Sequence, residues 1–214
     1  MGNINHIYNR GNSKQTIFRD DEDYSYFMNL LIVMNSLERK SVRGASLQNV
    51  GTNDLVDKHK HDEPVVSIGI YCLMPNHFHI LLRQEKENGI SLFLQKISTA
   101  YAMYFNKKYT RTGSLFEGKF KSKYAGEDVY LKYLFSYIHL NPLKLKHDDW
   151  KYRVIPNDDL LYRFIITYKY SSAKEYASSN FSITKPQAFP GYFLDRGSFR
   201  DFLFTWIKLQ HAQD

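Results

Sequence analysis

The sequence lacks the features that would place it in a membrane or in an oxidising compartment. It contains a single cysteine, Cys72, so no internal disulfide can form, which fits a reducing compartment. No apolar run approaches the roughly 20 residues that span a bilayer, and residues 1–5 do not resemble a signal peptide. We therefore expect a cytoplasmic protein. Cys72 stands in an apolar run, which favours a core residue over a nucleophile.

What the chain does have is positive charge and many aromatic side chains. Its 214 residues carry a net charge of +7 and include 17 tyrosines and 15 phenylalanines. Lysine and arginine attract phosphates, and unpaired bases stack on aromatic rings, so this composition suits a nucleic-acid binder. A basic protein with a tyrosine-rich core has the same composition. The hydrophobic content of 43% indicates a globular chain in either case.

The hydrophobic pattern predicts an α+β fold. Alternating and helical periodicities predict strands over residues 5–10, 65–73, 77–83 and 119–124, and helices over 23–39, 91–108 and 127–140. The order β-α-β-β-α-β followed by a helix is that of a ferredoxin-like sandwich with an antiparallel sheet. The last helix is then an addition to that core.

The chain divides into one main domain and a tail. We expect residues 1–150 to form the domain and residues 151–214 to form a C-terminal extension that packs on it. Residues 40–64 are polar and look like a surface insertion with no core of its own. A second His-x-His sequence, His59 to His61, falls in this insertion and is interpreted as solvated loop.

Two histidines stand two residues apart in an apolar run, at His77 and His79. In a strand these side chains point to the same face, so the two imidazoles can aim at one point. This spacing is half of a metal site. Two hydrogen-bonded strand histidines are the alternative.

The helix over 127–140 carries the other candidate groups. Tyr137 and Asn141 are four residues apart and share one helix face, whereas His139 points about 200° away from Tyr137. If this helix lies across the strand of His77 and His79, a phenol and an amide oxygen join the imidazoles. Such a set suits Mg²⁺ or Mn²⁺ when water and a substrate phosphate complete the shell, and the phenol is then a candidate covalent nucleophile. A structural tyrosine, a helix-capping Asn141 and a packing role for His139 are the alternatives.

Four sequence blocks resemble one known family in collinear order over about residues 3–150. The blocks are Asn9–Asn12, Tyr71–His79, Gly113–Ser122 and Tyr137–Pro142. They resemble the REP-associated tyrosine transposases, which are relatives of the single-tyrosine insertion-sequence transposases in the HUH superfamily.

The resemblance implies a ferredoxin-like nuclease that acts on single-stranded DNA, often beside a hairpin. His77 and His79 would hold the divalent metal, with Asn141 as third ligand. Tyr137 would attack a DNA phosphate and leave a 5′-phosphotyrosine and a free 3′-hydroxyl. Many such enzymes are dimers, and a bacterial, nucleoid-associated location would follow. Relatives commonly have glutamine where this chain has Asn141, whose reach is shorter, so the third ligand is the weakest part of the match.

Further residues are candidates for DNA contact. Lys119, Lys121 and Lys123 alternate on a predicted strand and so share a face, although lysines are also common on solvated edge strands. Arg10 and Asn12 stand in the first matching block, where a surface salt bridge is the alternative for Arg10.

A non-catalytic single-stranded nucleic-acid-binding protein, derived from a domesticated transposase, is the alternative function. Residues 118–121 match the RNA-recognition pattern poorly, which argues against an RNA-recognition domain.

Overall fold

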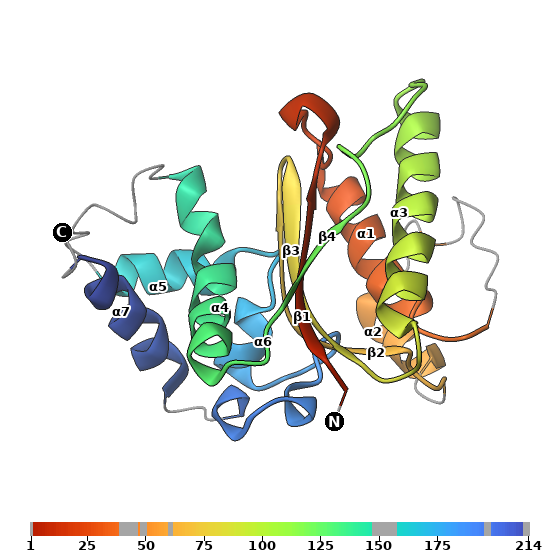
Figure 1. Ribbon diagram of the computed structural model, residues 1–214. Coiled ribbons are helices and arrows are strands. Elements are labelled where there is room, and N and C mark those ends of the chain that lie inside the picture. Colours follow the sequence, from red (N-terminus) through yellow and green to blue (C-terminus); the bar gives the residue numbers. More distant parts are fainter. Residues whose placement is uncertain are drawn as a thin grey trace.

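A four-stranded antiparallel sheet lies in the middle of the molecule, between two layers of helices (Figure 1). The computed structural model describes residues 2–38, 47, 51–59, 62–146, 158–194 and 198–211. The strands are β1 (Ile4–Arg10), β2 (Val66–Met74), β3 (His77–Gln84) and β4 (Lys121–Tyr124), in the spatial order β2-β3-β1-β4. The α-helices are α1 (Asp21–Val33), α2 (Thr52–His59), α3 (Gly89–Lys108), α4 (Asp128–Leu140), α5 (Asp158–Thr167), α6 (Ala173–Ser178) and α7 (Ser198–His211). Short 3-10 turns are η1 (Asn12–Lys14), η3 (Asn141–Leu145), η4 (Pro186–Ala188) and η5 (Gly191–Phe193).

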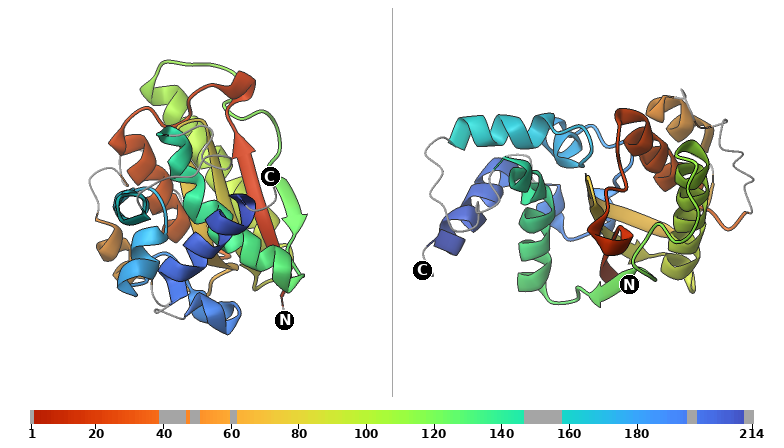
Figure 2. Two further views of the ribbon diagram at one scale, coloured as in Figure 1. Left: turned by 90° about the vertical axis from the view of Figure 1, so that its left-hand side faces the viewer. Right: turned by 90° about the horizontal axis from the view of Figure 1, so that it is seen from above.

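The two faces of the sheet carry separate cores. Helices α1 and α3 cover one face, and α4 with the helices of the tail covers the other (Figures 1 and 2). The chain order β1-α1-β2-β3-α3-β4 with both helices on one face is the ferredoxin-like arrangement, so the predicted fold class is confirmed. The additional helix α4 lies on the opposite face.

Helix α1 begins where the sequence indicates but ends earlier. The Asp20 side chain caps it by accepting a hydrogen bond from the Asp23 amide at 3.0 Å. The helix ends at Val33, whereas the prediction ran to Arg39. Asn35 explains the difference, because its Oδ1 accepts from the amides of Val65 and Val66 at 3.1 and 3.0 Å. These bonds turn the chain out of the helix toward the start of β2.

Strand β2 changes face at a β-bulge. The pairing register with β3 shifts between Ile68 and Ile70, so Ile68 joins the core under α1 and α3 while Ile70 joins the core under α4. Gly69 occupies the bulge. A Cβ there would meet the Phe189 ring at 2.7–3.0 Å, so only glycine permits this contact with the tail.

The tail covers the outer edge of β2. The Leu73 amide donates to the Tyr170 carbonyl at 2.9 Å, and the Ser172 amide donates to the Tyr71 carbonyl at 3.0 Å. Farther along the same edge, the Lys185 amide donates to the Ile68 carbonyl at 2.8 Å. The tail therefore occupies the edge of β2 at which a fifth strand would pair, and β2 is buried along its whole length.

The polar insertion contributes to the main core. Helix α2 packs against α1, and both Leu47 and Leu55 are buried. The expectation of a solvated loop is wrong for His59, which is half-buried at the end of α2 with its Nδ1 2.8 Å from Asp62 Oδ2. The predicted boundary at residue 150 and the histidine at position 61 lie outside the described residues. Within the described parts of the chain, no helix is long and apolar enough to cross a membrane.

Candidate active site

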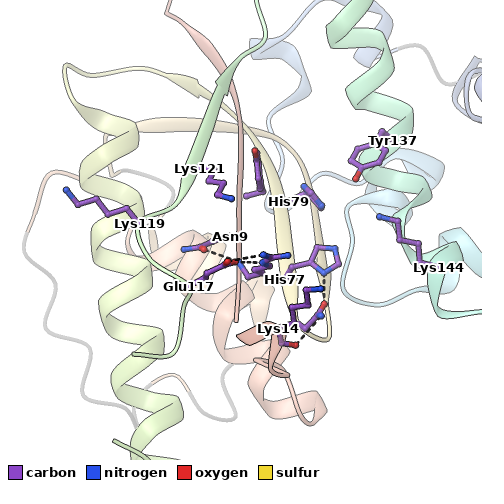
Figure 3. A pocket seen from close by; sticks show the side chains of 12 residues that line it. Asn9, Lys14, His77, His79, Glu117, Lys119, Lys121, Tyr137 and Lys144 are labelled. Atoms are coloured by element: carbon purple, nitrogen blue, oxygen red, sulfur yellow. Dashed lines mark hydrogen bonds and ion pairs between the residues drawn. The ribbon is translucent and has the colours of Figure 1, made fainter. Parts of the chain in front are cut away.

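A cleft of about 520 Å³ opens beside the sheet face that carries α4. It takes side chains from β1, β3, β4 and α4, and from the segments beside them (Figure 3). The residues that line it are Tyr8, Asn9, Arg10, Lys14, Asn76, His77, His79, Glu117, Lys119, Lys121, Tyr137 and Lys144. Five of them are lysine or arginine, so the cleft suits an anionic ligand.

His77 and His79 are neighbours in this cleft. They stand on the same side of β3, and their ring centroids are 5.2 Å apart with the planes almost perpendicular. Burial, with the charges of Lys144 and Arg10, lowers the pKa of His77 to about 4. The His77 ring is therefore neutral at neutral pH, as a metal ligand must be.

The Nδ1 atom of each histidine faces a hydrogen-bonding partner that is not among the site residues predicted from the sequence. His77 Nδ1 lies 2.6 Å from Asn76 Oδ1, and His79 Nδ1 lies 2.9 Å from His6 Nε2. His6 is buried, and this burial with the charge of Lys123 lowers its pKa to about 4. His6 stands two residues before Tyr8 and four before Arg10 on β1, so the alternation of that strand could have revealed it.

Tyr137 enters the cleft from α4. Its ring centroid lies 5.5 Å from that of His79 and 5.4 Å from that of Tyr133, one turn earlier on the helix. Lys144 Nζ lies 5.3 Å from the centre of the Tyr137 ring. Figure 3 shows Tyr137 and Lys144 reaching toward the histidines from the helical side. Helix α4 therefore lies beside the histidine strand, which is the condition under which Tyr137 joins the imidazoles.

Asn141 makes the contacts of a helix cap. Its Nδ2 donates to the Tyr137 carbonyl at 2.9 Å, its Oδ1 accepts from Lys144 Nζ at 2.9 Å, and the residue is fully buried. It is not among the residues that line the cleft. The Lys144 ammonium on its oxygen opposes a second cation at the same atom. The contacts favour the cap, and the ligand role stays a prediction.

Replacing Asn141 by aspartate separates these two roles. We expect Asn141→Asp to lower the free energy of unfolding, because a carboxylate oxygen then faces the Tyr137 carbonyl without a proton between them. This costs about 1–3 kcal/mol, and the new ion pair with Lys144 Nζ offsets only part of it. We expect no gain in Mn²⁺ affinity. Urea denaturation and calorimetric Mn²⁺ titration measure the two effects. Tighter Mn²⁺ binding in this variant would instead identify Asn141 as a ligand.

His139 points away from the cleft, as its position on the helix requires. It is fully buried, with Nδ1 2.8 Å from the Phe135 carbonyl and Nε2 2.9 Å from Ser172 Oγ. Because Nδ1 must donate to the carbonyl, Nε2 accepts from the serine hydroxyl. Burial lowers the pKa of His139 to about 3, so the ring is neutral. Its contact with Ser172 attaches helix α4 to the tail. This is the packing role that the sequence indicated.

The predicted DNA-contact residues divide into two groups. Lys119, Lys121 and Arg10 line the cleft, although Arg10 forms a two-point ion pair with Glu117, which lowers the pKa of that carboxyl. Asn12 is exposed and is not part of the lining. Lys123 lies outside the lining as well, with Nζ 4.3 Å from the centre of the Tyr130 ring on α4.

Other lining residues were missed in the sequence. Lys14 and Lys144 add positive charge, and Asn9 Nδ2 donates to the Gly118 carbonyl at 3.1 Å. Gly118 has φ near +150°, a conformation that favours glycine, and it lies between Glu117 and Lys119. Lys14 and Lys144 are separated by 130 positions in the chain, so no local pattern links them.

The comparisons with known proteins bear on this site. The model of the family described as "Transposase IS200 like" matches residues 25–141, a range that contains both cleft histidines and Tyr137. The chain belongs to this family. As an IS200-like transposase it is a member of a class that binds and processes DNA. The match also confirms the resemblance to insertion-sequence tyrosine transposases, and its range contains the second and third sequence blocks and the fourth as far as Asn141.

One solved structure is similar to this IS200-like transposase. It is described as "Structure of the REP associates tyrosine transposase bound to a REP hairpin". The two chains share 12% sequence identity over 86% of this chain and 84% of that one, with a TM-score of 0.48. No curated protein gives a significant match.

Proposed function

We propose that the protein is a metal-dependent endonuclease and strand transferase for single-stranded DNA, with Tyr137 as the covalent nucleophile. The observation that carries this proposal is the meeting of Tyr137, from α4, with His77 and His79, from β3, in one cleft. Helix α4 packs on the sheet face to which the two histidines of β3 point, so the phenol and the imidazoles face the same cleft. Hairpin-bearing repeat DNA is the substrate that the sequence resemblance suggests.

The donor set of the cleft fits a divalent cation with open positions. Within the described residues, no group of three or more histidine, cysteine or acidic side chains could hold a metal ion. Two imidazole nitrogens alone leave most of the coordination shell to water and phosphate oxygens, which is how Mg²⁺ and Mn²⁺ bind beside phosphate substrates. His77 and His79 would hold the ion, which would polarise the phosphate that is attacked.

The reaction proposed at Tyr137 balances without an external reagent. The phenol oxygen forms a bond to phosphorus, and the bond from phosphorus to the 3′-oxygen breaks. The phenol proton is lost and the leaving oxygen gains one, so the products are a 5′-phosphotyrosine and a 3′-hydroxyl. Attack of a 3′-hydroxyl on the phosphotyrosine reverses these bonds and joins a strand.

The cations of the cleft support an anionic, strand-like ligand. Lys121 on β4 and Lys144 beyond α4 line the cleft from opposite sides of the histidines (Figure 3), and Lys14 lies near Asn76. Phosphates of a DNA strand would lie between them. The rings of Tyr8 and Tyr137 offer surfaces on which unpaired bases stack.

A non-catalytic single-stranded nucleic-acid binder is the second candidate. The position of Asn141 favours it, because the residue expected to be the third ligand is buried and bonded to Lys144. A domesticated transposase could retain the basic cleft and have lost the chemistry. Dimerisation, and association with the nucleoid, stay predictions under both candidates.

The deciding experiment is a search for a covalent adduct. The full chain is incubated with Mn²⁺ and a hairpin-bearing single-stranded oligonucleotide labelled at its 3′ end, then separated under denaturing conditions. A 5′-phosphotyrosine joins the protein to the downstream fragment, so the 3′ label should move with the protein. The same oligonucleotide labelled at its 5′ end should release only a shorter, free fragment. Tight binding with neither product would favour the non-catalytic candidate.

Replacing two cleft lysines should change how binding depends on salt. Each lysine that contacts a single-stranded phosphate adds about 0.7 to the slope of log affinity against log salt. We therefore expect Lys119→Ala with Lys121→Ala to weaken binding and to reduce the slope by about 1.4. Fluorescence anisotropy of a labelled oligonucleotide over a range of salt concentrations measures this slope.

A matched variant controls for net charge alone. Lys107→Ala with Lys174→Ala removes the same charge from exposed positions outside the cleft lining, and its slope should stay close to that of the unmodified protein. If both double variants lose the same slope, the DNA does not lie in the cleft.

A further inference from the structure

The Asn76 amide has a defined orientation beside His77. Its Nδ2 donates to the Lys14 carbonyl at 3.3 Å, so its Oδ1 is the atom that faces His77 Nδ1, at 2.6 Å. An amide oxygen can only accept, so the His77 proton must be on Nδ1. The lone pair of that ring is then on Nε2. The two hydrogen bonds of Asn76, one to the Lys14 carbonyl and one from His77 Nδ1, thus select one of the two neutral tautomers of His77.

His6 has the corresponding place beside His79. The two rings lie edge to edge, with their centroids 5.1 Å apart and their planes 24° from parallel, and one hydrogen bond joins His6 Nε2 to His79 Nδ1. Both residues are buried, and they come from neighbouring strands β1 and β3. A neutral imidazole has one donor and one acceptor, so a single proton lies between these two nitrogens. When His79 carries it, His79 Nε2 has a lone pair, and when His6 carries it, His79 Nε2 bears a proton.

We infer that Asn76 and His6 are positioning residues that hold His77 and His79 with their protons on Nδ1, so that both Nε2 atoms can coordinate the metal. This inference rests on the proposed function, because it concerns the metal that His77 and His79 would hold. In this arrangement His77 Nδ1 donates to the amide oxygen of Asn76, and His79 Nδ1 donates to the ring nitrogen Nε2 of His6. Partners of this kind fix the ring orientation and the protonated nitrogen of a metal-binding histidine.

His6 is suited to this role and not to that of a third ligand. Its Nε2 is directed at the Nδ1 of His79, which is the ring nitrogen on the other side from the proposed metal. His6 is 6% exposed and does not line the cleft. It pairs with Leu81 of β3, two residues along β1 from Tyr8, which is the partner of His79 and lines the cleft.

Histidine tautomers can be read directly, without metal or DNA. Long-range proton–nitrogen correlation spectra of the full chain, labelled with ¹⁵N in its histidines, distinguish protons on Nδ1 from protons on Nε2. We expect both His77 and His79 to carry the proton on Nδ1. Asn76→Ala should move the His77 population toward the other tautomer, and His6→Leu should do the same for His79. Spectra that show Nε2 protonated in the unmodified protein at both residues would overturn the inference.

Metal affinity provides the second measurement. Calorimetric titration with Mn²⁺ should show 10- to 100-fold weaker binding for His6→Leu and for Asn76→Ala, the loss typical of such partners. His6→Gln offers an amide oxygen to His79 Nδ1 and should recover most of the affinity. His59→Gln, which removes a histidine on α2 across the sheet, should bind like the unmodified protein.

The outcomes separate this inference from the proposed function. Equal Mn²⁺ affinity in His6→Leu, Asn76→Ala and the unmodified protein would overturn the positioning role, even if the unmodified protein forms a covalent DNA adduct. Weaker Mn²⁺ binding in both variants would support it, even if no adduct forms. Equal loss in His6→Leu and His6→Gln would indicate a packing role for His6 and would overturn its part of the inference.

Discussion

Tyr137→Phe should abolish the covalent protein–DNA adduct while DNA binding stays about unchanged. Phenylalanine keeps the ring that packs against His79 and Tyr133 but lacks the oxygen that would form the bond to phosphorus. We expect adduct formation to fall by roughly 10³-fold or more, because removal of a covalent nucleophile leaves only binding and charge stabilisation. Denaturing gels with a 3′-labelled oligonucleotide measure the adduct, and anisotropy measures binding.

The neighbouring tyrosine on α4 supplies the matched control. Tyr133 is stacked on Tyr137, half-buried on the same helix face, and is not among the residues that line the cleft. Tyr133→Phe should therefore keep the adduct at nearly the original level. An adduct that survives in Tyr137→Phe, or disappears in Tyr133→Phe alone, would show that the nucleophile has been assigned to the wrong residue.

His77→Ala and His79→Ala should each remove cleavage that depends on Mg²⁺ or Mn²⁺. Loss of an outer partner of a metal ligand typically costs about 10- to 100-fold, so loss of the ligand itself should cost more than about 100-fold. Excess chelator should have the same effect on the unmodified protein. The measurement is the initial rate of adduct formation over a range of Mn²⁺ concentrations.

Folding and binding must be followed in the same variants. Both histidines lie in β3, between two strands, so a general loss of structure would also remove activity. We expect the thermal unfolding transition and metal-free binding of single-stranded DNA to be retained. His59→Ala, outside the cleft, should keep full cleavage. Undiminished cleavage in chelator by the unmodified protein would contradict the metal requirement.

Much of the architecture follows from local patterns in the sequence. The strands at β1, β2 and β3 were predicted to within about two residues, because alternation and apolar runs reflect which side chains the sheet buries. The start of α1 follows from its aspartate cap. The end of α1 does not follow from the local sequence, because Asn35 turns the chain by accepting a hydrogen bond from the Val65 amide, 30 positions away. A helical pattern continues past that point in the sequence, but the tertiary contact prevails.

The site was predictable where its residues are close in the chain. His77 and His79 share a face because strands have a period of two, and Tyr137 and His139 point apart because helices have a period of 3.6. Asn141 shares the helix face of Tyr137, yet its side chain folds back on the Tyr137 carbonyl and binds Lys144. Spacing along a helix determines the direction of a residue but not the partner that its amide selects.

By itself, the sequence determined the ferredoxin-like order of elements, the pair of strand histidines and the tyrosine of helix α4, because each depends on periodicity or on contiguous motifs. The tertiary structure decided that α4 crosses the face bearing those histidines and that Gly69 lets the tail pack against β2. It also decided that His6 lies behind His79 and that Lys14 and Lys144 line the same cleft. These features depend on contacts between segments far apart in the chain, and such contacts leave no period in the sequence.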